Sequence, residues 1–254
     1  MYAVISDIHS NLEALTAVLA DLDALGVRDV RCLGDVVGYG PSPLECVDLV
    51  QRRAQVVVRG NHDEALVHGA YGFHLRAKDA LDWTRDQLRP GFMSGQAVRR
   101  RWDWLTTLPL RHEDGPDVFV HGSPRDPTQE YLMAAEAAYG PSEKFEEVFA
   151  AFDRLLFVGH THHPGVITSD YEGRTPAQLG GALRVDDLAG RKAIVNVGSV
   201  GQPRDGDPRA CYVLVDDDVV TWRRVPYAAD RTVARVRATP RLHPSLGERL
   251  LVGT

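Results

Sequence analysis

The sequence has few cysteines and no long apolar run, and each shortage excludes a class of protein. Its 254 residues include only three cysteines, Cys32, Cys46 and Cys211. Their number and scattered spacing exclude a disulfide framework and a CxxC metal site, so we expect three buried thiols. No apolar run approaches the roughly 18 residues that a membrane-spanning helix needs. The acidic Asp7 interrupts the N-terminal segment before a signal peptide is complete, so we expect a cytoplasmic protein with no membrane partner.

The sequence also has fewer positively than negatively charged residues. The chain has 29 Lys and Arg residues against 35 Asp and Glu, a formal net charge of −6. Proteins built to hold duplex nucleic acid carry a basic excess, so stable nucleic-acid binding is not expected. A phosphate-bearing substrate stays open, because bound metal ions would supply positive charge. Hydrophobic residues make up 44% of the chain and charged residues 25%, which is ordinary for a globular domain.

The first sixty residues alternate short apolar runs with amphipathic segments. Three apolar runs predict buried strands, at residues 2–6, 30–33 and 56–58. The segments 11–25 and 42–53 predict helices, the first capped by Ser10 or Asn11. The second opens with Ser42 and Glu45 in capping-box spacing, with proline at the first helical position. This order predicts a parallel or mixed sheet with helices on its faces.

The pattern changes in the middle of the chain. Residues 64–107 are mostly helical in pattern, and we interpret them as an insertion in a single α/β domain that spans residues 1–254. Further strands are predicted at 118–120, 155–158, 166–168, 183–186, 193–197, 211–215 and 219–225. A helix is expected around 142–152, and Asp216 to Asp218 read as a hairpin turn. The segment 229–251 predicts a helix broken at Pro240 or Pro244.

Polar residues gather where five of the predicted strands end. They are Asp7 and His9; Asp35; Asn61, His62 and Asp63; His121; and His160 and His162. In open α/β sheets the ligand crevice lies outside the carboxyl ends of the strands, so we expect these side chains to meet at one edge.

The residue types at this edge predict a metal centre. Asp, His and Asn supply oxygen and nitrogen ligands suited to Mn²⁺, Fe, Ni²⁺ or Zn²⁺, and no thiolate is among them. Asp7 and His9 are two residues apart, a spacing that on an extended strand points both side chains to one face, and His160 and His162 share it. Seven candidate ligands exceed the need of one ion. We therefore expect two ions, about 3.5–4 Å apart, which suit in-line displacement at phosphorus.

These blocks, in this order, resemble the calcineurin-like metallophosphoesterase superfamily. Its pattern is Asp-x-His, Gly-Asp, Gly-Asn-His-Asp/Glu, a lone His and Gly-His-x-His. The matching blocks are Asp7-Ile8-His9, Gly34-Asp35, Gly60-Asn61-His62-Asp63, His121 and Gly159-His160-Thr161-His162. Residues 7–15 and 196–204 are similar to its small bacterial and archaeal branch. The resemblance implies a four-layer αββα sandwich, in which two mixed β-sheets pack face to face between flanking helices.

The resemblance also implies a role for each position. The first ion would be held by Asp7, His9 and His162, the second by Asn61, His121 and His160, and Asp35 would bridge the two. A metal-bridging hydroxide would attack phosphorus. His62 would protonate the leaving oxygen or stabilise the transition state, and Asp63 would orient His62 by a hydrogen bond. A helix N-cap is the alternative role of Asp63.

Other residues have two interpretations each. Arg204 follows a glycine-containing loop, where it would bind substrate phosphate or form a surface salt bridge. His163 neighbours a ligand, but we expect its side chain on the opposite face. The basic and aromatic segment 99–104 would form a nucleic-acid stacking platform or a helix with its arginines in solvent, and the acidic residues nearby favour the helix.

We therefore expect a dinuclear metal-dependent phosphoesterase that acts on phosphomonoesters, phosphodiesters or both, with manganese as the first candidate metal. A nuclease, a protein serine/threonine phosphatase and a dinucleoside-polyphosphate hydrolase would use the same metal core. A non-catalytic interaction module is disfavoured, because none of the implied ligands is substituted. The insertion at 64–107 is expected to overhang the crevice and set substrate size, so that replacing it changes substrate preference without abolishing metal binding.

Overall fold

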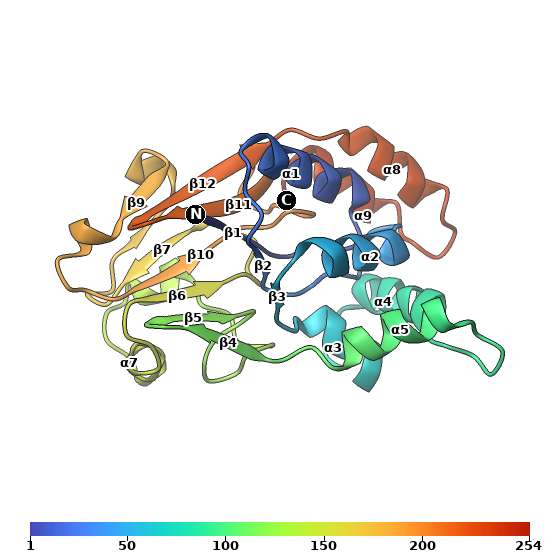
Figure 1. The fold of residues 1–254 in the computed structure, drawn as a ribbon, viewed down its shortest axis with the longest axis horizontal. Coiled ribbons are helices and arrows are strands. Elements are labelled where there is room, and N and C mark those ends of the chain that lie inside the picture. Colours follow the sequence, from blue (N-terminus) through green and yellow to red (C-terminus); the bar gives the residue numbers. More distant parts are fainter.

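The apolar runs of the sequence form two six-stranded β-sheets in the computed structural model, which describes residues 1–254 (Figure 1). In spatial order, the first sheet contains β3 (Val56–Val57), β2 (Val30–Cys32), β1 (Tyr2–Ile5), β11 (Ala210–Asp216), β12 (Val219–Val225) and β9 (Ala182–Arg184). The second contains β4 (Arg111–Asp114), β5 (Asp117–Val120), β6 (Leu155–Val158), β10 (Ala193–Asn196), β7 (Gly165–Thr168) and β8 (Gly173–Arg174).

Both sheets mix parallel and antiparallel pairs, as the sequence predicts. β1, β2 and β3 are parallel neighbours, and so are β5, β6 and β10. β11 and β12 form an antiparallel hairpin in which Asp216 pairs with Val219 across the expected turn. The parallel pairs bring the carboxyl ends of β1, β2 and β3 to one edge, and those of β5 and β6 to one edge of the second sheet.

Helices cover the outer faces of the sheets (Figure 1). On the first sheet lie α1 (Leu12–Ala24) and α2 (Pro43–Arg53), whereas α8 (Ala229–Arg237) packs against α1 and α9 (Ser245–Glu248) packs against α8. α6 (Ala134–Ala137) and α7 (Glu143–Ala150) lie on the second sheet. The expected insertion contains α4 (Leu75–Leu88), α5 (Gln96–Thr106) and most of α3 (Asn61–His68). Three short 3₁₀ turns complete the fold: η1 (Ala177–Leu179), η2 (Val185–Leu188) and η3 (Arg249–Leu251).

The alternation of side chains along the strands creates the layers. In β1, Val4 packs between the two sheets, whereas Ala3 and Ile5 join the core beneath α1 and α2. In β6, Phe157 packs between the sheets, whereas Leu156 packs with the helix α7. Successive side chains on a strand point to opposite faces, so each sheet contributes to an inner and an outer core. This confirms the predicted sandwich of two mixed sheets between helices.

Several local predictions need correction. Ser42 forms no side-chain cap, although Pro43 does open α2, so the capping box is wrong. α3 begins at Asn61 rather than after the polar block. The strands β4 and β8 and the helix α6 were not predicted, because their sequences lack an apolar periodicity. Asn11 caps α1 as expected, the last segment breaks between α8 and α9, and all three cysteines are free and buried. None of the helices combines the length and the apolar character needed to cross a membrane.

Candidate metal centre

The loops that leave five strands bring the predicted site residues together. Asp7 and His9 follow β1, Asp35 follows β2, Asn61 to Asp63 form the first turn of α3, His121 follows β5, and His160 and His162 follow β6. All nine side chains are buried, and the most exposed belongs to a residue only 7% accessible. Nine polar or charged residues buried close together require hydrogen-bond partners or ions, because burying such groups without them is costly.

The backbone at four of these residues is left-handed rather than extended. The φ angles of Asp7 and His9 are 54° and 49°, and those of His160 and His162 are 63° and 61°. The expectation that both pairs sit on an extended strand is therefore wrong, since β1 ends at Ile5 and β6 at Val158. This conformation costs roughly 1–2 kcal/mol for a residue other than glycine, and such strain gathers at functional sites. Here Asp7 and His9 point to one cluster, which also contains His162, whereas His160 belongs to a second cluster.

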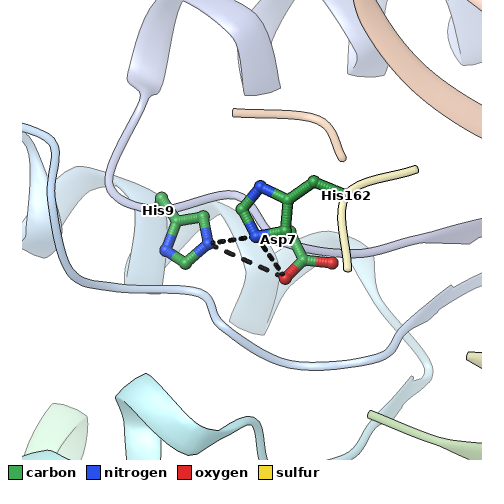
Figure 2. A group of neighbouring side chains, drawn as sticks. All are labelled: Asp7, His9 and His162. Atoms are coloured by element: carbon green, nitrogen blue, oxygen red, sulfur yellow. Dashed lines mark hydrogen bonds and ion pairs between the residues drawn. The ribbon is translucent and has the colours of Figure 1, made fainter. Parts of the chain in front are cut away.

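The first group of side chains contains Asp7, His9 and His162 (Figure 2). The Nδ1 atom of His9 faces the carbonyl oxygen of Val37 at 3.3 Å, and Nδ1 of His162 faces that of Gln202 at 2.5 Å. A carbonyl only accepts, so each Nδ1 carries the proton and donates it, and each Nε2 is a bare lone pair. The two Nε2 atoms nevertheless lie 3.1 Å apart, and Nε2 of His162 lies 3.1 Å from Oδ1 of Asp7.

The second group repeats this arrangement around His121 and His160. Nδ1 of His121 donates to the carbonyl of Leu33 at 3.0 Å, and Nε2 of His160 donates to that of Gln129 at 3.1 Å. The free ring atoms, Nε2 of His121 and Nδ1 of His160, lie 3.1 Å apart. Oδ1 of Asn61 lies 3.1 Å from the same Nε2 atom. Each group is thus a set of acceptors that converge with no proton between them, and a cation fits such a set.

Asp35 lies between the two groups. Its Oδ2 atom is 3.6 Å from Nε2 of His9 and 3.4 Å from Nε2 of His121. Its other oxygen, Oδ1, accepts the backbone N–H of His62 at 2.8 Å, which fixes the carboxylate plane. A single carboxylate oxygen therefore faces both sets of acceptors.

Burial keeps the imidazoles neutral. It lowers the pKa of His9 and of His162 to about 4, and that of His121 to about 3. Burial, together with the charges of Asp7 and Asp63, raises the pKa of Asp35 well above its usual range. Neutral imidazole is the form that binds a metal ion.

His62 and Asp63 do not form the expected hydrogen bond. Oδ1 of Asp63 accepts the N–H of Val36 at 3.0 Å and that of Val37 at 3.4 Å, and Oδ2 accepts that of Gly60 at 3.1 Å. Nδ1 of His62 is buried without a partner. The N-cap of α3 is Gly60, so the N-cap role expected for Asp63 is wrong. From the third position of the helix, Asp63 accepts the N–H of Gly60 and anchors the loop after β2, whereas packing holds the His62 ring in place.

A pocket of about 240 Å³ opens over this centre, and Arg204 lines it. Arg204 forms no salt bridge; its Nη2 atom donates to Oε1 of Gln202 at 2.8 Å, and its buried Nε has no partner. The alternative of a surface salt bridge is therefore wrong. His163 lines a different, more apolar pocket and faces the carbonyl of Thr161, as expected for a residue outside the site.

Sequence reasoning did not single out the aromatic residues of this pocket. Tyr39 and Phe73 pack against the His62 ring, with ring centroids at 4.5 and 5.0 Å. Tyr71 and Tyr131 also line the pocket, and they come from loops with no periodicity. The one available signal was the position of Tyr71 and Phe73 in the predicted insertion. That insertion does reach the pocket, through the loop between α3 and α4.

Comparisons with known proteins agree with the geometry. Residues 1–218 match the model of the calcineurin-like phosphoesterase superfamily domain. An uncharacterized protein of Methanocaldococcus jannaschii is 36% identical over an alignment of 266 residues, which covers 100% of this chain and 98% of the relative. The crystal structure of a metallophosphoesterase from Sphaerobacter thermophilus is similar with a TM-score of 0.81, 41% identity and coverage of 100% and 98%. A hypothetical protein from Pyrococcus horikoshii OT3 shares the fold, with a TM-score of 0.72, 20% identity and coverage of 100% and 98%.

Proposed function

Because this chain belongs to the calcineurin-like phosphoesterase superfamily, we propose that it is a dinuclear metal-dependent phosphoesterase acting on phosphomonoesters, phosphodiesters or both. One observation carries the proposal. Two sets of bare nitrogen and oxygen lone pairs converge in a buried site, and the Oδ2 atom of Asp35 faces both. Such an arrangement is unfavourable without cations and is completed by two of them.

The ligand sets follow from these contacts. Asp7, His9 and His162 would hold one ion, and Asn61, His121 and His160 the other, with Asp35 shared. The absence of thiolate and the mixture of imidazole with carboxylate fit Mn²⁺, with Fe, Ni²⁺ and Zn²⁺ as alternatives. When bound, two such ions supply Lewis acidity that activates water and neutralises phosphoryl oxygens. The backbone carbonyls behind the imidazoles fix the ring orientations.

Two further side chains complete the reaction site. His62 lines the pocket beside His9 and Asp35, where its N–H would be donated to the leaving oxygen of the ester. Arg204 is the only lysine or arginine of the pocket lining, and its guanidinium is not neutralised by a carboxylate. It would bind a non-bridging phosphate oxygen and so orient the ester over the metal centre.

The proposal is tested by restoring single metals to chelated protein. Mn²⁺, Ni²⁺, Mg²⁺ and Zn²⁺ are added separately, and turnover of 4-nitrophenyl phosphate and bis(4-nitrophenyl) phosphate is measured beside bound metal per chain. We expect two ions per chain and metal-dependent turnover, with the ratio of the two rates dividing diesterase from monoesterase. Two bound ions with no turnover of either ester would favour an interaction module instead.

Three variants make the test specific. His62→Ala is expected to lower kcat by about 10²- to 10⁴-fold with two ions retained, because it removes a proton donor. Asp35→Asn is expected to lower both the bound metal and turnover. His68→Ala is the matched control, since His68 is the exposed last residue of the same helix. A His62→Ala variant as active as His68→Ala would contradict the role of His62.

A further inference from the structure

The pocket over the metal centre is small and carries four aromatic side chains. Its volume is about 240 Å³, below the roughly 300–1,000 Å³ of pockets that enclose drug-sized ligands. Tyr39, Tyr71, Phe73 and Tyr131 all line it. A pocket of this size fits a phosphate group that carries a small organic group.

Two of the four rings already have partners inside the protein. Tyr39 packs against the rings of His9 and His62, with centroids at 4.8 and 4.5 Å. Phe73 meets the His62 ring edge to face, at 5.0 Å. These two rings hold the histidine in place.

The other two rings are more exposed, and their open surface is available to a ligand. Tyr131 stacks on the His160 ring, with centroids 3.8 Å apart and planes 24° apart, yet it stays 46% exposed. Its segment is held by the contact between Nε2 of His160 and the carbonyl of Gln129. Tyr71 is 86% exposed at the pocket lining and contacts Gly69, where an added Cβ would meet its ring at 2.9 Å. An exposed ring in a pocket lining offers a flat apolar face on which an aromatic group can stack.

Charge around the pocket limits the rest of the ligand. Arg204 is its only Arg or Lys side chain, and Asp35, which faces both ligand sets, is its only carboxylate. Arg204 and the proposed ions would bind the phosphate, and the rest of the lining offers aromatic rings beside the amide of Gln129 and the imidazole of His74 to the group that the phosphate carries.

We propose that the substrate is a small phosphate ester whose organic group contains an aromatic ring, stacked on Tyr131 and Tyr71. The inference rests on the phosphoesterase function proposed above. Hydrolysis of such a monoester consumes one water, breaks the bond between phosphorus and the ester oxygen, and releases inorganic phosphate and the ring-bearing alcohol. The ring is an aryl group or a nucleobase, and both present the same flat π-face.

Two pairs of substrates test the ring while the leaving alcohol stays matched. Benzyl phosphate is compared with cyclohexylmethyl phosphate, and adenosine 5′-monophosphate with ribose 5-phosphate. We expect kcat/KM to favour the aromatic member of at least one pair by about 3- to 10-fold, the range of one aromatic stacking contact. A preference for adenosine 5′-monophosphate over ribose 5-phosphate identifies a nucleobase. A preference for benzyl phosphate over cyclohexylmethyl phosphate alone identifies a simple aryl group.

Variants then locate the preference. Tyr71→Leu and Tyr131→Leu are expected to abolish it, mainly through KM for the aromatic ester, whereas Tyr131→Phe retains it because the ring is kept. Tyr139→Leu is the control, since Tyr139 is 92% exposed and does not line the pocket. No preference in either pair, or a preference that both Leu variants keep, would overturn the inference while leaving the phosphoesterase function intact.

A binding measurement separates the inference from the proposed function. Benzylphosphonate and cyclohexylmethylphosphonate are titrated into the metal-loaded protein by calorimetry, which needs no turnover. Tighter binding of the benzyl compound, lost in Tyr131→Leu, supports the aromatic subsite even if no ester is hydrolysed. Equal binding of the two phosphonates counts against the subsite whatever the activity.

Discussion

The imidazole of His62 lies in a space that its neighbours define closely. Gly38 has a φ of +95°, and a Cβ added there would lie 2.2 Å from Nδ1 of His62. Tyr39 follows it with a φ of 55° and places its ring against the same imidazole. The loop after β2 thus fits around the histidine only with glycine at this position.

Gly38→Ala is therefore expected to displace His62. We expect turnover to fall at least about tenfold, because small misplacements of a reacting group are costly, with two ions still bound. The control is Gly190→Ala, at φ +83° with nothing within 4 Å of the added carbon. Both variants share the backbone strain, so only the loss of turnover beyond that of Gly190→Ala reports on His62. Equal kinetics of the two variants, with metal content measured in parallel, would refute this reading.

At the same scale, the sequence predicts which residues form the candidate site better than it predicts their conformation. The order of Asp, Asn and His at strand ends predicts which side chains meet. It does not predict the left-handed backbone of Asp7 and His160, which depends on the loops that pack around them. The sequence also does not indicate which ring nitrogen faces the site, Nδ1 in His160 and Nε2 in His121. The other nitrogen of each ring is fixed by a backbone carbonyl that is distant in sequence.

At the scale of the element, the first turn of α3 joins two parts of the site. Asp63 accepts three backbone N–H groups, one at the start of the helix and two in the loop after β2. The carbonyl of Val37 in that loop faces Nδ1 of His9. Burial raises the pKa of Asp63 to about 7, against these hydrogen bonds, which lower it. Asp63 thus ties the helix to the segment that orients His9, a proposed metal ligand.

Asp63→Ala is expected to lower the free energy of unfolding by roughly 1–3 kcal/mol, because three buried donors lose their acceptor. Metal affinity should fall with it, and Asp63→Asn should lie between this variant and the wild type. Urea unfolding of the chelated protein and metal titration measure the two effects. If turnover collapses while stability and metal affinity stay at wild-type values, Asp63 acts on His62 after all.

The sequence predicts helices and strands where their packing requires a periodic pattern of apolar residues. β6 and β12 have the predicted bounds, because both are apolar or alternating. β4 reads Arg-His-Glu-Asp and pairs at a sheet edge, where no apolar face is required, so its sequence gives no strand signal. The insertion was predicted as helical. That Leu81 and Leu105 share one core with the helices of the first sheet depends on tertiary packing, which periodicity cannot show.

At the scale of the whole molecule, the buried histidines of the site make the metal-free fold less stable in acid. Burial lowers the pKa of His9, His62, His121, His160 and His162 below that of a free histidine. The unfolded chain therefore binds more protons than the folded one below pH ~6.5. Burial raises the pKa of Asp35 and Asp63, which acts in the opposite direction. Five groups against two leave a net loss of stability as pH falls.

We accordingly expect chelated protein to lose stability as pH falls from about 6.5 toward 4, the window between the unfolded pKa of histidine and the folded pKa of His9 and His162. Each such histidine contributes a slope of about 1.4 kcal/mol per pH unit within this window. His121→Asn removes one of them, so its unfolding free energy, measured in urea at pH 6, 5 and 4.5, should fall less steeply than that of the wild type by about this amount. Bound metal should flatten the plots of unfolding free energy against pH for both proteins over the pH range in which it stays bound, because the ions stabilise the folded state alone. Equal slopes for the metal-free wild type and His121→Asn would mean that burial does not hold His121 neutral.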